Sequence, residues 1–239
     1  MPVMSRVEAA FCRSAPWRGF TARVVMPWVL HGHDLTGDVL EIGAGAGANT
    51  AVLARTQPAA TITATDIDPA MVAATRRRVA RFGARVTVER ADTTALPFDD
   101  HRFDAAVSLL MLHHVLDWEA ALGELARALR PGGRLLGYDL TATRVARAIH
   151  VADRSPHRLL DPDQLRDGLA AAGFVAIDVT AGLCGLVARF CATVPASTDD
   201  GRRPHPGARV DAGGQTSKTS PGSMATLRGE PEQRGPSVG

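Results

Sequence analysis

Long apolar runs, paired cysteines and lysine are scarce in this sequence of 239 residues. No stretch approaches the ~20 uncharged apolar residues that a bilayer-spanning helix needs, so we expect no transmembrane segment. Cys12, Cys184 and Cys191 include no CxxC pair, which argues against a disulfide framework or a zinc knuckle. Charged residues interrupt positions 1–20, unlike a secretory signal. The sequence therefore predicts a cytoplasmic protein with reduced thiols.

Excess charge is also nearly absent, since the formal net charge is only +2 despite a pI near 8.7. Residues 34–194 contain seventeen arginines and nineteen acidic residues, so this central part is slightly acidic. Binding to nucleic acid depends on neutralising phosphates with basic side chains. A nucleic-acid partner is therefore not expected, and nothing in the sequence requires an oligomer, so we take a monomer as the default.

Composition divides the chain into three parts. Residues 195–239 are rich in glycine, proline and small polar residues, and such a segment cannot bury enough apolar surface to fold, so we expect it to be a disordered tail. Residues 1–33 contain four of the eleven aromatic residues and several apolar ones. We expect them to form a helical cap over a ligand cleft. The alternative is an amphipathic element that contacts a membrane or a lipid-like ligand.

Between residues 34 and 194, strand-like and helix-like segments alternate. The strand-like runs are 38–42, 61–65, 85–89, 105–110 and 134–139, and the helical segments are 48–55, 70–82, 118–129 and 162–172. This alternation predicts βαβ units and a doubly wound, Rossmann-like α/β fold with helices on both faces of a parallel sheet. Two last strand-like runs, 175–180 and 186–194, have no helix between them. The sheet should therefore end in an antiparallel hairpin.

A glycine-rich loop follows the first predicted strand, where Glu41 precedes Gly43, Gly45 and Gly47. Glycine permits a tight turn and lets the backbone approach a ligand at the carboxyl end of a parallel strand. The loop predicts a nucleotide-type ligand, although it also fits a dinucleotide such as NAD, and alone it can be a simple packing turn. No GK[ST] follows, which excludes an ATP-binding P-loop.

Two aspartates follow the next two predicted strands. Asp66 lies where a carboxylate can accept hydrogen bonds from ribose hydroxyls, and Asp92 lies where one can accept from an adenine amine. Each can instead cap a helix or form a turn. Glu41 discriminates between the candidate ligands, because the repulsion between its carboxylate and a pyrophosphate about 4 Å away would cost roughly 1–4 kcal/mol. S-adenosylmethionine carries a sulfonium and an ammonium instead, so it is favoured.

Five sequence blocks extend this pattern in register: Glu41 to Gly47, Thr63 to Pro69, Ala91 to Phe98, Leu112 to His114, and Leu129 to Leu135. Together they resemble a class I S-adenosylmethionine-dependent methyltransferase of the broad small-molecule type, similar to the type 11 methyltransferases. The resemblance runs through residues 37–194. It implies a seven-stranded sheet whose last strand is antiparallel, and S-adenosylmethionine as the cofactor.

The resemblance also implies a cofactor site formed after the first four strands. In it the glycines form the cofactor turn, the glutamate helps place the methionyl end, and the aspartates bind the ribose and, with a threonine, the adenine amine. An isoleucine flanks the adenine, and backbone at the end of the fourth strand lines the methionine moiety. The residues are Glu41, Gly43, Gly45, Gly47, Asp66, Ile67, Asp92, Thr93 and Leu109.

Candidate catalytic residues follow the fourth predicted strand. Methyl transfer chiefly needs alignment of nucleophile, methyl and sulfur, so no metal is expected. A general base would add roughly 10²–10⁴ in rate for an acidic acceptor, and His113 and His114 are the candidates. Their alternative role is to pack or line the pocket. Tyr138 and Asp139 follow the fifth strand towards the same region, and an Arg/His cluster lies in the 141–160 insertion, either as an anion contact or as a solvated helix face.

The sequence thus predicts an enzyme that methylates a small, partly hydrophobic acceptor at oxygen, carbon or nitrogen. Three alternatives remain: a cofactor-binding module without turnover, an RNA methyltransferase, and an NAD-linked oxidoreductase. Residues 109–113 lack the Asn/Asp-Pro-Pro-Tyr/Phe element of amino-methylating nucleic-acid enzymes. This absence and the acidic central part favour the small-molecule acceptor.

Overall fold

The computed structural model describes residues 19–144, 146–147 and 157–196. The sequence predictions for Cys12, for the first two aromatic residues of the N-terminal segment and for the tail beyond residue 196 lie outside this range.

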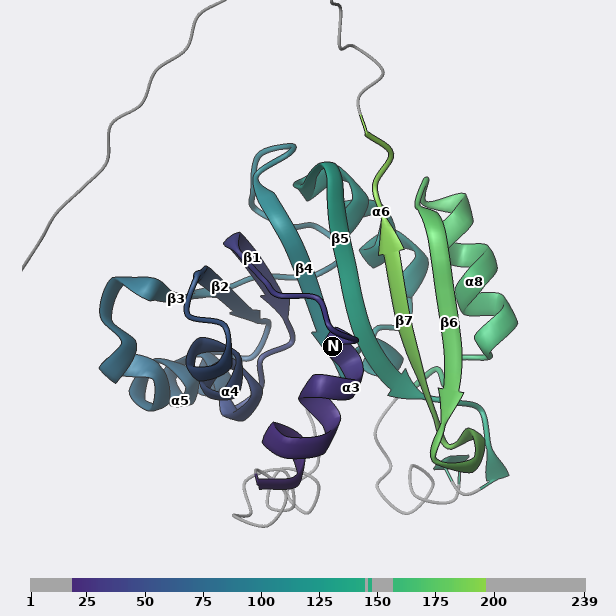
Figure 1. The fold of residues 1–239 in the computed structure, drawn as a ribbon, viewed down its shortest axis with the longest axis horizontal. Coiled ribbons are helices and arrows are strands. Elements are labelled where there is room, and N and C mark those ends of the chain that lie inside the picture. Colours follow the sequence, from purple (N-terminus) through teal and green to yellow (C-terminus); the bar gives the residue numbers. More distant parts are fainter. Residues whose placement is uncertain (1–18, 145, 148–156, 197–239) are drawn as a thin grey trace, which may run out of the picture. The chain divides into compact units, whose positions relative to one another are not determined.

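The described residues form a seven-stranded sheet of order β3-β2-β1-β4-β5-β7-β6. The strands are β1 Gly37–Ile42, β2 Ala60–Asp66, β3 Val86–Arg90, β4 Phe103–Leu109, β5 Leu129–Leu140, β6 Val175–Gly182 and β7 Val187–Thr193. Strands β1 to β5 pair in parallel, whereas β7 pairs antiparallel with both β5 and β6. In Figure 1 the arrow of β7 accordingly points against those of β4, β5 and β6. The predicted fold, including its antiparallel end, is confirmed.

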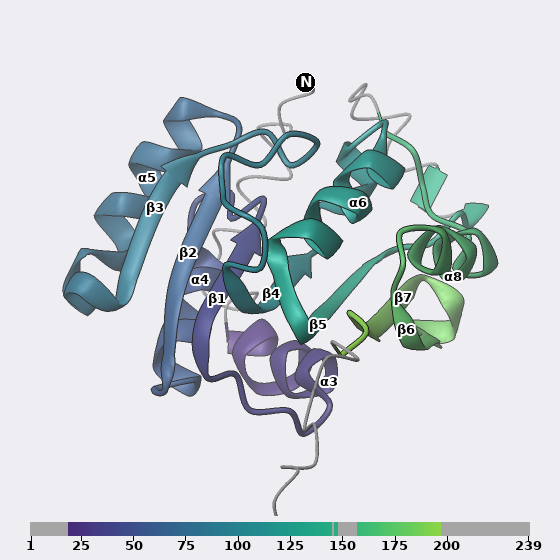
Figure 2. The same cartoon turned by 90° about the horizontal axis from the view of Figure 1, so that it is seen from above.

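Helices cover both faces of this sheet. One apolar cluster joins the sheet to η1 (Thr21–Val25), α3 (Met26–Leu30), α4 (Ala48–Thr56) and α5 (Pro69–Val79). A second cluster joins the other face to α6 (Trp118–Ala128) and α8 (Pro162–Ala171). Figure 1 shows α3 in front of the sheet and α6 behind it, and Figure 2 shows α6 and α8 side by side. The layers bring the loops after β1 to β5 to one edge, called here the carboxyl edge.

Two element boundaries differ from the sequence prediction. Strand β5 begins at Leu129, where the sequence predicted the last residue of a helix and no strand before residue 134, because Leu129 pairs with Phe103 before the register shifts at Ala105. Helix α5 ends at Val79, three residues early, and the chain continues as the short helix η2 (Ala80–Arg85). Gly83 there adopts φ +57°, which an α-helix cannot contain.

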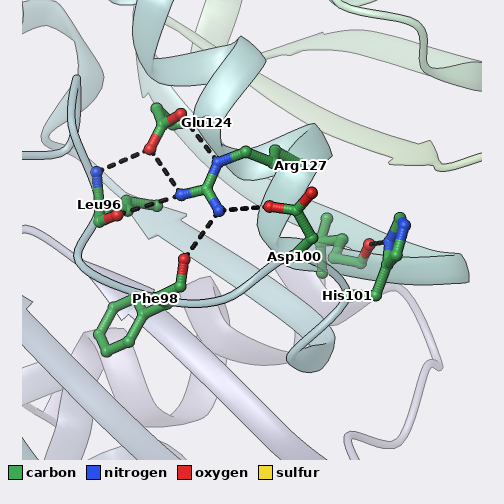
Figure 3. A network of polar contacts seen from close by, with 7 residues as sticks. Leu96, Phe98, Asp100, His101, Glu124 and Arg127 are labelled. Atoms are coloured by element: carbon green, nitrogen blue, oxygen red, sulfur yellow. Dashed lines mark hydrogen bonds and ion pairs between the residues drawn. The ribbon is translucent and has the colours of Figure 1, made fainter.

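The loop between β3 and β4 is fixed to α6 by Arg127 (Figure 3). Its guanidinium donates to the carbonyl oxygens of Phe98 at 2.7 Å and Leu96 at 3.0 Å. It also forms ion pairs with Asp100 at 2.7 Å and Glu124 at 2.8 Å, and Glu124 accepts from the Leu96 backbone N–H. Because one planar group satisfies two carbonyls and two carboxylates, this loop, which starts beside Asp92, has a defined position.

No helix among the described residues is both long enough and apolar enough to cross a membrane.

Candidate functional site

The glycine-rich loop lies between β1 and α4 at the carboxyl edge. Gly43, Gly45 and Gly47 have φ values of +63°, +55° and +75°, which residues with a Cβ rarely adopt. Hydrogen bonds to neighbouring elements hold the loop, among them the Ala44 N–H to the Thr65 carbonyl at 2.8 Å and the buried Thr75 hydroxyl to the Gly45 carbonyl at 2.6 Å. The loop is therefore a fixed turn in which Gly43 and Ala46 are partly exposed, while Gly45 and Gly47 are buried. The role of Thr75 was not predicted, because a threonine inside a helix carries no such signal.

Glu41 is the second-last residue of β1, just before this loop, and is 1% exposed. Its Oε2 atom accepts no hydrogen bond from the described residues. Burial raises the pKa of Glu41 to about 7; the Thr50 hydroxyl opposes this rise, and the negative charge of Asp66 adds a smaller increase. A buried carboxylate with one oxygen that no described residue engages favours a positively charged group beside it.

Asp66 ends β2 and faces the glycine loop. Its Oδ2 accepts from the Gly45 N–H at 2.8 Å, and its Oδ1 accepts from the Asp68 N–H at 2.9 Å. Burial raises the pKa of Asp66, and these backbone hydrogen bonds oppose the rise. A carboxylate has about four acceptor sites, so the half-buried Asp66 retains capacity for a ligand hydroxyl.

Asp92 follows β3 next to Asp66, because the Ala91 N–H donates to the Asp66 carbonyl at 3.1 Å. Its Oδ1 accepts from both the backbone N–H and the hydroxyl of Thr94, at 3.0 and 2.7 Å. The turn-forming role weighed from the sequence is therefore present, while no described residue engages the other oxygen. Thr93 is buried and Ile67 is half-buried at the same edge.

The end of β4 meets the glycine loop. Leu109 is buried, and Leu110 then adopts φ +60°, which turns the chain so that Met111 lies over Gly43. A Cβ on Gly43 would stand 2.5 Å from the Met111 methyl carbon. The turn at Leu110 could not be predicted, because leucine gives no signal for a left-handed backbone.

His113 and Asp139 form a buried pair between the ends of β4 and β5. The His113 Nδ1 contacts Asp139 Oδ1, and both side chains are 1% exposed. Asp139 also accepts from the backbone N–H groups of His113 at 3.2 Å and Leu140 at 2.6 Å. The Arg158 N–H donates to the His113 carbonyl at 2.8 Å. These contacts fix the orientation of the imidazole.

The other candidates at this edge separate. The His114 ring lies 4.0 Å from the His113 ring, centroid to centroid. Tyr138 points to the opposite face of the sheet, where its ring meets Trp28 edge to face at 6.2 Å. Arg158 forms an ion pair with Glu119 at 2.6 Å, while much of the remaining Arg/His cluster lies outside the described residues.

The predicted cofactor residues thus gather on the neighbouring loops after β3, β2, β1 and β4, and the histidines follow on the β4 side. Such a row can hold an elongated ligand along the edge, with its reacting end towards His113. In the described part of the chain, no group of three or more His, Cys, Asp or Glu residues could hold a metal ion.

Comparisons with known proteins agree with this geometry. A family model described as a methyltransferase domain matches residues 40–137. The chain is 33% identical over 214 residues to the demethylmenaquinone methyltransferase of Clavibacter sepedonicus, covering 79% of this chain and 83% of that protein. It is 35% identical over 148 residues to the O-methyltransferase cnsE of Penicillium expansum, covering 59% and 53% of the two chains.

Among solved structures, phosphoethanolamine N-methyltransferase 2 of Haemonchus contortus, in complex with phosphomonomethylethanolamine and S-adenosylhomocysteine, has the same fold. It gives a TM-score of 0.61 at 17% identity over 73% of this chain and 52% of that one. With the fold, the glycine loop and the near full-length relative in agreement, this chain belongs to the class I S-adenosylmethionine-dependent methyltransferases.

Proposed function

We propose that this enzyme binds S-adenosylmethionine at the glycine loop and transfers its methyl group to a small, partly hydrophobic acceptor. The observation that carries the proposal is Glu41, a buried carboxylate with one oxygen that no described residue engages. A cationic ligand stabilises such a group, whereas a pyrophosphate would repel it by roughly 1–4 kcal/mol at about 4 Å. S-adenosylmethionine therefore fits this position better than NAD.

The residues at the edge fit the rest of this cofactor. The loop is partly exposed at Gly43, Asp66 has acceptor capacity for the ribose hydroxyls, and Asp92 has an oxygen for the adenine amine that no described residue engages. Ile67, Thr93 and Leu109 supply walls. When bound, S-adenosylmethionine supplies a methyl group that its positively charged sulfur already activates.

We assign His113 as the general base and Asp139 as its positioning residue. A histidine whose Nδ1 faces a buried carboxylate carries its acceptor lone pair on Nε2. It can accept a proton from an acceptor hydroxyl or an acidic carbon while the nucleophile attacks the methyl group. His114 packs against this ring and lines the same region.

The acceptor class is supported by the relatives. One is named for a demethylmenaquinone and another as an O-methyltransferase, so both a quinone-like ring and a hydroxyl are reasonable acceptors for this chain. A phenolic hydroxyl and the reduced, quinol form of such a ring each carry an acidic O–H from which a base can take the proton. We further propose that the enzyme acts in the cytoplasm as a monomer and without a nucleic-acid partner, in line with the free Cys184 and Cys191 thiols and the near-balanced charge.

Calorimetric titration of the full chain with S-adenosylmethionine, with NAD as the control ligand, tests the cofactor. Saturable binding of the first alone supports the proposal, and binding of NAD, or of neither ligand to the folded protein, contradicts it. A panel of quinols, phenols and amines, assayed by release of S-adenosylhomocysteine, then identifies the acceptor.

The roles of His113 and Asp139 are tested by pH profiles with the acceptor found. His113→Asn should lower kcat by about 10²-fold or more at unchanged cofactor affinity. Asp139→Asn should lower kcat less and move the acid limb of the kcat/KM profile to lower pH, because it removes a negative charge beside the imidazole. If the kcat/KM profile against pH is unchanged in both variants, His113 and Asp139 only pack in the core and do not take part in the reaction.

A further inference from the structure

The first described helical segment is apolar on both of its faces. From Phe20 to Leu30 the sequence contains one charged residue, Arg23. The inner face packs in the core, while the outer face, formed by Phe20, Arg23, Val24 and Pro27, is exposed. Phe20 is 39% and Val24 is 51% exposed. A helix of a water-soluble protein normally carries polar residues on its outer face, so this segment is suited to an apolar surrounding on that side.

A second exposed apolar side chain stands at the β6–β7 turn. Leu183 is 65% exposed, and it and Cys184 both adopt left-handed backbone, with φ values of +48° and +54°. Glycine or asparagine is usual at such positions, and a bulky apolar residue is an outlier. The turn therefore presents a large apolar group outward where a small polar one would fit better.

These side chains lie at the carboxyl edge. The β6–β7 turn follows Gly182, which stands beside the end of β5, and a Cβ on Gly182 would lie 2.7 Å from the Trp28 ring of α3. Figure 1 shows the purple η1 and α3 segment and the β6–β7 turn at the same edge. Leu116, 54% exposed, follows the His113 loop at this edge on the other face of the sheet.

In the part of the chain that the structure describes, five large apolar residues are exposed, and four of them are at this edge. The fifth is Val175, 48% exposed, which begins β6 at the opposite edge of the sheet. The concentration at one edge is therefore a property of that edge and not of the whole surface. Val175 also provides a natural control.

Three exposed arginines at the carboxyl edge suit an anionic surface. Arg23, Arg144 and Arg147 are exposed, and none of their side chains forms a hydrogen bond or an ion pair with a described residue. The acids beside Leu116 are already engaged, since Asp117 caps α6 and Glu119 pairs with Arg158. Apolar side chains flanked by exposed arginines that no described residue pairs with are the pattern of a protein that lies on anionic lipid.

We propose that the carboxyl edge is a docking surface for an anionic lipid bilayer. Val24 and Leu183 enter the interfacial layer from two sides of the site, and Arg23, Arg144 and Arg147 face the lipid headgroups. The contact is peripheral, and it extends beyond the N-terminal segment to the β6–β7 turn. Docking would let a hydrophobic acceptor reach the site from the membrane. This consequence rests on the proposed function.

The test is co-sedimentation of the full chain with vesicles of equal parts phosphatidylglycerol and phosphatidylcholine. Val24→Asp and Leu183→Asp should each lower the partition coefficient at least tenfold, and Val175→Asp, at a valine of similar exposure, should leave it unchanged. Both edge positions are exposed, and aspartate tolerates the left-handed backbone at Leu183 better than leucine does, so folding should persist. Replacing Arg23, Arg144 and Arg147 by glutamine should abolish the preference over pure phosphatidylcholine vesicles.

Absence of vesicle binding by the unmodified chain, or equal binding by all three aspartate variants, would overturn the proposal. A dimer in size-exclusion chromatography that Val24→Asp or Leu183→Asp converts to a monomer, without vesicle binding, would assign the surface to self-association instead. Calorimetric titration of each variant with S-adenosylmethionine measures cofactor affinity independently of vesicle binding. A failure of the docking surface and a failure of the proposed cofactor site are therefore distinguishable.

Discussion

Glu41→Gln should change stability in a pH-dependent manner. Burial raises the pKa of Glu41 from its ordinary value of 4.5 to about 7. At 1.36 kcal/mol per pH unit, this rise corresponds to about 3 kcal/mol. Because the folded-state pKa is the higher one, the folded protein benefits from neutral Glu41 below pH 4.5 and loses that stability as the pH rises through 7.

The glutamine variant cannot ionise, so its stability relative to the unmodified protein should rise over this window. Between pH 5.5 and 8 the gain should be about 2 kcal/mol, or roughly 4–8 °C in Tm for a domain of this size. Any fixed cost of burying the amide is the same at both pH values and cancels in the comparison. Differential scanning calorimetry of both proteins at the two pH values measures the gain.

Cofactor binding should respond in the opposite direction. At pH 8 the glutamine variant lacks the charge that we assign to the cation of S-adenosylmethionine, so its Kd should rise at least about tenfold. The exposed Glu89→Gln is the matched control for the change in net charge. If the Tm difference between Glu41→Gln and the unmodified protein does not grow with pH, Glu41 does not carry a destabilising buried charge. If the affinity for S-adenosylmethionine is unchanged, Glu41 has no role in cofactor binding.

Three further predictions concern other positions. Asp66→Ala should weaken S-adenosylmethionine binding by roughly 10–150-fold in calorimetry, the value of a hydrogen bond to a charged group, and unaltered affinity would remove Asp66 from the site. Gly137→Ala should destabilise the protein by about 1–3 kcal/mol in urea unfolding, because the new Cβ would stand 2.4 Å from the Phe190 ring. Gly123→Ala, at an exposed position of α6 where a Cβ would meet no atom within 4 Å, should stabilise the protein by about 0.5–1 kcal/mol. Arg127→Lys should cost about 1–3 kcal/mol despite keeping the charge, since an ammonium cannot reach all the partners of the guanidinium; equal urea midpoints would contradict this.

The fold was predictable because its signals are local and repeated. Strand β4 is a short, mostly apolar run, β2 is rich in β-branched residues, and α5 and α8 begin with an aspartate cap followed by proline. The start of β5 was missed, because Leu129 joins the sheet only through its pairing with Phe103, which is distant in the sequence.

The candidate site was predictable where glycine and carboxylates follow strands, since the ends of parallel strands must meet. It was not predictable where contacts depend on the direction of one side chain. Tyr138 and Asp139 were grouped from the sequence, yet adjacent strand residues point to opposite faces, so only Asp139 reaches His113. Likewise, no pattern indicates that Met111 covers Gly43, because a left-handed leucine produces that contact.

The antiparallel end of the sheet has a consequence for how this chain folds. Strands β6 and β7 are joined by a hairpin, so their connection contains no helix that could cover the face of β5 and β7 on which α3 lies. Met26, Val29 and Leu30 fill that face beside Leu136 and Val187. One of the first described segments and the last strand therefore complete the same core, a contact of high sequence separation that forms slowly. During synthesis, this part of the core must wait until β7 has left the ribosome, and stable folding is expected to be a late, cooperative event.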